Sequence, residues 1–165
     1  MQRLADDMQR YRSLRSSTAA VMWTAYVAHA ALTGGTLAMQ WAPLPIRPAV
    51  ARVAGAALVV GGSGLCVAGV CRFGGVGELA GTRNQSLLTT GSYGHSRNPQ
   101  YLGYLIALAG AAVGRRSGSA LASTGALAVI YAAWIPVEEN HLTELYGHHY
   151  TDYTHRTRRW WGRRN

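Results

Sequence analysis

The sequence contains no lysine: all 16 of its basic residues are arginine, and with only 7 acidic residues the formal net charge is +9. A nucleic-acid-binding protein would interleave its basic side chains with core residues along one face. Here the arginines occur in clusters, and long uncharged apolar stretches separate them. This placement argues against a nucleic-acid partner and favours a polar rim around a membrane-embedded core.

Cysteine is also scarce, and its two residues, Cys66 and Cys71, lie within or at the end of an apolar run. Two cysteines are too few for a disulfide scaffold, and their spacing matches no metal-ligand pattern. We therefore expect both to be buried bystanders. The chain begins with a polar stretch, and the apolar run after it is too long for the core of a cleavable signal, so we predict no signal peptide.

Apolar residues form four long segments. They cover residues 18–41, 53–70, 101–114 and 120–137. The first would be about 36 Å long as a helix, enough to span a bilayer, whereas the third is short enough to be packed inside the protein. A tight polar turn at residues 115–119 predicts that the last two segments form a helical hairpin. We predict an all-α polytopic membrane protein with one domain, about four transmembrane helices and a C-terminal cytoplasmic or interfacial helical segment over residues 138–156.

The distribution of arginine predicts the orientation, because arginine is enriched on the cytoplasmic side of membrane helices. With the N-terminus inside, 12 arginines fall on the inner side and 4 on the outer side. Both termini should therefore be cytoplasmic. The absence of lysine and the abundance of alanine and glycine fit a bacterial source, and hence an inner (plasma) membrane. Trp160 and Trp161, which arginines flank, are expected to anchor the tail at the headgroup level.

Small residues recur at helical intervals within the apolar segments. Gly55, Gly62 and Gly69 are spaced seven residues apart, and Gly110 and Gly114 form a GxxxG pair. In lipid, such positions let helix backbones approach closely. We interpret them as packing positions without a chemical role. The glycine cluster Gly61, Gly62 and Gly64 is not expected to form a dinucleotide-binding loop, because no βα alternation follows it.

Histidines supply further polar candidates. His29 lies in the middle of the first segment, where an ionisable residue is either functional or hydrogen-bonded to a neighbouring helix, and we favour the hydrogen bond. His141, His148 and His155 recur every seven residues and would share a face of one helix. Zinc ligands on one helix usually lie one turn apart, and two turns separate histidines by about 10 Å. We therefore predict a solvated stripe and no metal.

Two polar, aromatic stretches flank the predicted hairpin on its cytoplasmic side. LLTTGSYGHSRNPQYLGY (87–104) leads into the third segment, and EENHLTELYGHHYTDY (138–153) follows the fourth. Arg97, Glu138 and Glu139 would lie near the membrane surface, where an unpaired charge is costly. They predict either an ion pair that pins the ends of the hairpin together or a water-accessible cavity.

These stretches resemble the signature of the isoprenylcysteine carboxyl methyltransferase and phospholipid methyltransferase group of membrane enzymes. The matching blocks are Thr90-Gly91-Ser92-Tyr93, Arg97-Asn98-Pro99-Gln100-Tyr101-Leu102-Gly103, Glu138-Glu139-Asn140-His141-Leu142 and Gly147-His148-His149-Tyr150-Thr151-Asp152-Tyr153. We accordingly divide the domain into N-terminal helices with a loop (1–86) and a cofactor-binding catalytic part (87–165). Asn98 departs from the pattern, because the best-known members carry histidine there, and asparagine forms hydrogen bonds but cannot titrate.

The resemblance implies S-adenosylmethionine-dependent methyl transfer to a lipophilic acceptor at the cytoplasmic membrane face, with S-adenosylhomocysteine as product. It places the cofactor between the start of the third helix, the end of the fourth and the C-terminal segment. Arg97 and Glu139 would be catalytic. The expected cofactor-binding residues are Tyr93, Asn98, Pro99, Tyr101, Gly103, Glu138 and Leu142. Arg97 would grip the cofactor carboxylate or an anionic acceptor, and Glu139 would be the base for an amine or a phenol.

The methyl acceptor stays open among the carboxylate, phenol, amine and thiol groups of a lipid or other lipophilic molecule. Two other functions also stay open. An NADPH-dependent membrane reductase of sterol-reductase-like architecture should need more phosphate-facing arginines and more helices. A non-catalytic membrane scaffold would have little reason to keep the arginine, proline and glutamates of both motif blocks together.

Overall fold

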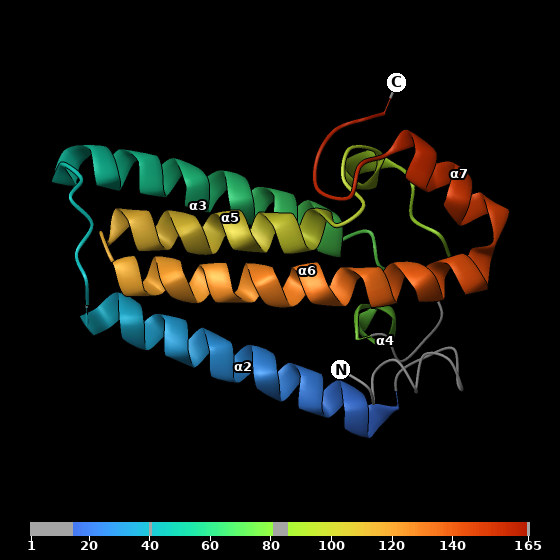
Figure 1. Cartoon of the computed structure of the whole chain (residues 1–165), viewed down its shortest axis with the longest axis horizontal. Coiled ribbons are helices and arrows are strands. Elements are labelled where there is room, and N and C mark those ends of the chain that lie inside the picture. Colours follow the sequence, from blue (N-terminus) through green and yellow to red (C-terminus); the bar gives the residue numbers. More distant parts are fainter. Residues whose placement is uncertain (1–14, 40, 81–85, 165) are drawn as a thin grey trace. The chain divides into compact units, whose positions relative to one another are not determined.

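A computed structural model describes residues 15–39, 41–80 and 86–164. Within these ranges the protein is helical, without a β-strand beyond two isolated bridges. The helices are α2 (Ser16–Met39), α3 (Pro48–Val70), α4 (Val76–Leu79), the 3-10 turn η1 (Gly91–Gly94), α5 (Pro99–Gly114), α6 (Gly118–Tyr146) and α7 (His148–Arg156), shown in Figure 1. The all-α prediction and the helical nature of the four apolar segments are thus confirmed.

Two of the described helices, α3 and α6, are long and apolar enough to cross a membrane. α5 has 16 residues, which correspond to about 24 Å of helix, less than the roughly 30 Å core of a bilayer. Because α5 and α6 are joined through only three residues, they form the predicted helical hairpin.

The chain divides into two compact units. We call the first, Tyr26–Val67 with Gln100–Tyr131, the helical unit. The second, the polar unit, comprises the described residues of Met1–Ala25, Ala68–Pro99 and Ala132–Asn165.

In the helical unit, glycines on α3 and α5 face one another. A Cβ atom built on Gly55 would lie 2.5 Å from the Cα of Gly114, and one built on Gly110 would lie 2.7 Å from the backbone nitrogen of Val59. Gly62 likewise lies against Gly103. A side chain at these positions would meet backbone, so the two helices approach as closely as glycine permits. The predicted packing role is thus confirmed for Gly55, Gly62, Gly110 and Gly114.

On the other side of α5, α6 packs between α5 and α2. The rings of Tyr101 and Tyr131 have their centroids 4.6 Å apart. From α2, the hydroxyl of Thr33 lies 3.2 Å from that of Ser123. His29 Nε2 lies 3.4 Å from the Ser123 carbonyl oxygen. The helix segments of this unit therefore run in the order α3, α5, α6, α2 (Figure 1), and the hydrogen bond predicted for His29 is confirmed.

The connection between α2 and α3 meets the turn between α5 and α6. Leu44 donates a backbone hydrogen bond to Arg116 (2.8 Å), and Gly118 donates one to Ala42 (2.8 Å). Arg47 and Arg115, both predicted for the outer side, thus belong to the same end of the helical unit. The orientation also relied on arginines outside the described residues, namely Arg3, Arg10, Arg12 and Arg83.

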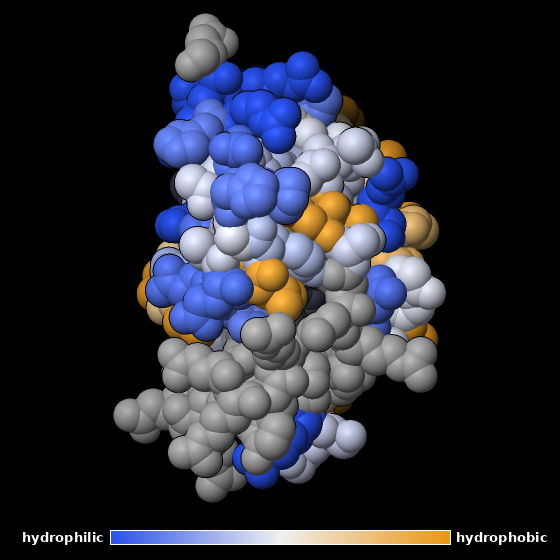
Figure 2. All heavy atoms as spheres, turned by 90° about the vertical axis from the view of Figure 1, so that its right-hand side faces the viewer, coloured by the Kyte–Doolittle hydropathy of each residue, from blue (hydrophilic) through white to orange (hydrophobic). Residues whose placement is uncertain are grey.

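The polar unit contains the polar ends of the helices together with α4, η1 and α7. In the view of Figure 2, which faces α7, hydrophilic residues gather on the described part of the surface. Cys71 belongs to the polar unit, in the turn after α3. It is exposed, so the prediction that it is buried is wrong. The apolar run that suggested burial ends with the helix at Val70.

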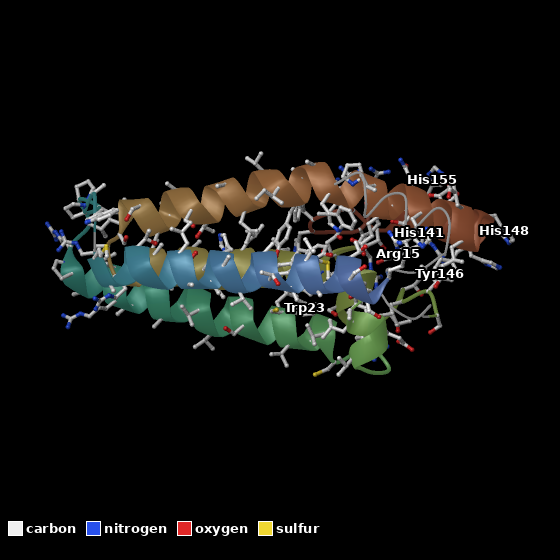
Figure 3. All side chains as sticks on the ribbon, turned by 90° about the horizontal axis from the view of Figure 1, so that it is seen from below. Arg15, Trp23, His141, Tyr146, His148 and His155 are labelled. Atoms are coloured by element: carbon white, nitrogen blue, oxygen red, sulfur yellow. The ribbon has the colours of Figure 1, made fainter. Side chains whose placement is uncertain are left out.

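The helical segment predicted over residues 138–156 is in fact two helices. α6 continues to Tyr146, and Gly147 ends it with a positive φ of 55°, a conformation that favours glycine. His141 therefore lies on α6, whereas His148 and His155 lie on α7, and the predicted common face is wrong. Figure 3 shows these three histidines at separate places along α6 and α7. Among the described residues, no group of three or more His, Cys, Asp or Glu side chains is placed to hold a metal ion.

Candidate functional site

The polar unit brings the two motif blocks together through an ion pair. Arg97, just before α5, donates from Nε (3.1 Å) and Nη2 (2.6 Å) to Oε1 of Glu139 on α6. The side chains are only 8% and 14% exposed. Of the two arrangements predicted from the sequence, the ion pair that holds the ends of the hairpin together is therefore present.

A second arginine, which the sequence did not single out, holds the same carboxylate. Arg159 donates from Nε to Oε1 of Glu139 (3.2 Å) and from Nη2 to Oε2 (2.6 Å). These hydrogen bonds raise the pKa of Arg159. Its side chain is 39% exposed, so it forms the outer side of a triad in which Arg97 is the buried member.

Arg97 also reaches the C-terminal end of α7. Its Nη1 donates to the backbone carbonyls of Thr154 (3.4 Å) and Thr157 (3.2 Å). The last carbonyls of a helix lack partners within the helix and carry partial negative charge, so a guanidinium is a suitable donor there. All three nitrogens of the Arg97 guanidinium are thus engaged.

Residues 157–164, which we call the tail strap, fold back along the segment before α5. Arg97 donates its backbone N–H to Arg158 (3.1 Å), and Gly162 donates to His95 (2.7 Å). Asn98, 5% exposed, donates its side-chain amide to the carbonyl of Arg159 at 3.2 Å. Asn98 therefore fixes the strap, a role that needs an amide donor and no titratable group.

Two buried tyrosines of α7 connect the remaining motif residues. Tyr150 and Tyr153 are each 3% exposed, and the Tyr153 hydroxyl donates to the backbone carbonyl of Tyr93 at 2.7 Å. Burial raises the pKa of both phenols, so they are protonated at neutral pH. The Thr-Gly-x-Tyr and Gly-x-x-Tyr-x-x-Tyr motifs therefore meet in space.

The other predicted site residues divide between the units. Pro99 is fully buried in the polar unit as the first residue of α5, a position at which proline costs no hydrogen bond. Glu138 and Leu142 are half-buried on α6 in the same unit. Tyr101 and Gly103 belong to the helical unit, where one stacks on Tyr131 and the other packs against α3.

Comparison with known proteins gives one family. A sequence model of the phospholipid methyltransferases matches residues 50–149, which is more than half of the chain. The matched region contains Arg97 and Glu139 but ends before Tyr153 and Arg159. No curated protein and no solved structure matches the chain.

Proposed function

Because the chain belongs to the phospholipid methyltransferase family and is a membrane methyltransferase, we propose that it transfers a methyl group from S-adenosylmethionine to a lipophilic acceptor at the cytoplasmic face of the membrane. The observation that carries the proposal is the Glu139 carboxylate between Arg97 and Arg159. It joins both motif blocks and the tail strap in one charged cluster. A bacterial inner membrane with both termini inside is the setting we propose.

The charges of the cluster suit this cofactor. S-adenosylmethionine carries a carboxylate, an ammonium and a sulfonium, and when bound it supplies an electrophilic methyl group. Glu138 is a half-buried carboxylate on α6 suited to the cationic groups. Tyrosine faces also attract such cations, and Tyr150 of α7 belongs to the same unit as Glu138. Leu142, half-buried on α6, would form part of the surrounding wall, and the buried Asn98 and Pro99 would support it from behind.

Arg159 is the better candidate to bind the cofactor carboxylate. Every nitrogen of Arg97 already has a partner, and its side chain is 8% exposed. Arg159 uses only Nε and Nη2, and its Nη1 has no partner among the described residues. A guanidinium that retains free N–H groups can still grip a carboxylate. In our proposal Arg97 is a positioning residue, which acts by holding Glu139.

Glu139 is a positioning group in the same sense. Its two oxygens together accept four hydrogen bonds from the arginines. It has little capacity left to accept a proton from a substrate. The acceptor, whether a carboxylate, phenol, amine or thiol, would then have to react already deprotonated or lose its proton to another group. Family membership lends no support to the reductase or the scaffold.

The test is calorimetric titration of the detergent-purified protein with S-adenosylhomocysteine, with NADPH as the comparison ligand. We expect saturable binding of S-adenosylhomocysteine and no heat from NADPH. Binding of neither compound would contradict the methyltransferase proposal, and binding of NADPH alone would identify a dinucleotide enzyme.

The same titration tests the proposed role of Arg159. Arg159→Gln should weaken S-adenosylhomocysteine binding by at least about tenfold, because a hydrogen bond to a charged group is worth about 1.5–3 kcal/mol. Arg115→Gln, which removes an exposed arginine of the helical unit, should bind as the unaltered protein does. If Arg159→Gln binds normally, Arg159 does not hold the cofactor.

A further inference from the structure

The tail strap is a closed turn that fixes the direction of its side chains. Thr157 and Arg163 form an antiparallel bridge. Arg158 donates its backbone N–H to Gly162 (2.9 Å), and Arg164 donates to Arg156 (2.9 Å). Gly162 has a φ of 103°, which permits the chain to reverse. The strap therefore presents its side chains from a defined backbone.

The arginines of the strap point in different directions. Arg159 turns inward to Glu139, as described above. Arg158, Arg163 and Arg164 are exposed, and none of the three forms an ion pair within the part of the chain that the structure describes. Trp161, 58% exposed, lies among them with its ring centroid 6.1 Å from that of His95.

The strap contacts α6 just beyond the end of its apolar stretch. Arg159 contacts Glu139, which is two residues beyond Val137, the last residue of that stretch. Two residues of helix correspond to about 3 Å. The headgroups of a bilayer begin where the hydrocarbon core ends, so the outward side chains of the strap belong at that depth.

We propose that Arg158, Arg163, Arg164 and Trp161 form a binding surface for the headgroups of anionic phospholipids. Guanidinium groups bind phosphate oxygens in pairs, and tryptophan is the side chain that favours the headgroup layer. Three unpaired arginines on one turn complement a negatively charged leaflet. This surface does not depend on the proposed methyl transfer, since none of its four side chains takes part in the Glu139 cluster.

The experiment is native mass spectrometry of the full chain, released from detergent after titration with phosphatidylglycerol or phosphatidylcholine. We expect the protein to retain phosphatidylglycerol with an affinity at least about fivefold higher than that for phosphatidylcholine. The variant Arg158→Gln/Arg163→Gln/Arg164→Gln should lose this preference. A matched control, Arg47→Gln/Arg52→Gln/Arg115→Gln, removes three exposed arginines elsewhere and should keep it.

Two outcomes would overturn the proposal. A strap variant that keeps the preference, or a control that loses it equally, would mean that general surface charge attracts the lipid. Displacement of phosphatidylglycerol by a short DNA duplex at equal phosphate concentration would mean that the surface binds nucleic acid instead. If the glutamine variant fails to fold, Trp161→Ala should lower the affinity for both lipids, and Arg158→Lys/Arg163→Lys/Arg164→Lys should retain the preference for phosphatidylglycerol. Unchanged affinities in the Trp161→Ala variant, or loss of the preference in the lysine variant, would count against the surface.

Discussion

At the scale of the residue, the Glu139 carboxylate organises the polar unit. Removing one partner of a buried ion pair leaves an uncompensated charge and typically costs about 3–5 kcal/mol. Arg97 and Glu139 both belong to recognisable motifs, so they could be predicted as site residues from the sequence. Arg159 could not be chosen in this way, because it is one of five arginines in the tail and only the closed turn directs it inward.

Tyr153 and Tyr150 offer a matched pair for testing the contact between motifs. Tyr153→Phe removes the hydroxyl that donates to Tyr93, which should lower the free energy of unfolding by about 1–2 kcal/mol. Tyr150 is equally buried, and its hydroxyl has no hydrogen bond among the described residues. Tyr150→Phe should therefore lower the free energy of unfolding by less. Denaturant unfolding in detergent measures both. Equal losses would show that the Tyr153–Tyr93 hydrogen bond contributes nothing of its own.

At the scale of the element, the length of an apolar run predicted the long helices correctly. Polar composition did not predict where one helix ends and the next begins. The four long helices follow from uninterrupted apolar runs, because a helix satisfies the backbone groups of an apolar segment within the segment itself. The break between α6 and α7 is invisible to that argument, because the residues on both sides of Gly147 are polar and helix-compatible. Only the positive φ of Gly147 reveals it.

The approach of α3 to α5 predicts opposite effects for two adjacent glycines. A Cβ at Gly62 would lie 2.7 Å from the carbonyl oxygen of Gly103, whereas nothing lies within 4 Å of one at Gly61. Gly62→Ala should therefore lower the free energy of unfolding by roughly 1–3 kcal/mol through overpacking. Gly61→Ala should raise it by about 0.5–1 kcal/mol, because alanine favours the helix.

Thermal unfolding in detergent compares the two variants directly. A lower Tm for Gly62→Ala alone is the expected result. A loss of similar size in both would indicate that α3 and α5 do not approach through this face.

At the scale of the whole molecule, arginine placement predicts which side of the membrane each end occupies. Reporter fusions at the two termini should both report the cytoplasm, since 12 of the 16 arginines fall on that side in the predicted topology. A fusion in the connection between α2 and α3 should report the outside. An external C-terminus would place the Glu139 cluster on the wrong side for a cytoplasmic cofactor and would overturn the proposed orientation.

The two arginine contacts on Glu139 also close two loops of different length in the chain. Arg97 precedes Glu139 by 42 residues, and Arg159 follows it by 20. Because the entropy cost of closing a loop grows only slowly with its length, by about 0.6 kcal/mol for each doubling, the two loops cost nearly the same to close. One carboxylate thus cross-links the start of α5 and the tail strap, and its loss would release both loops at once.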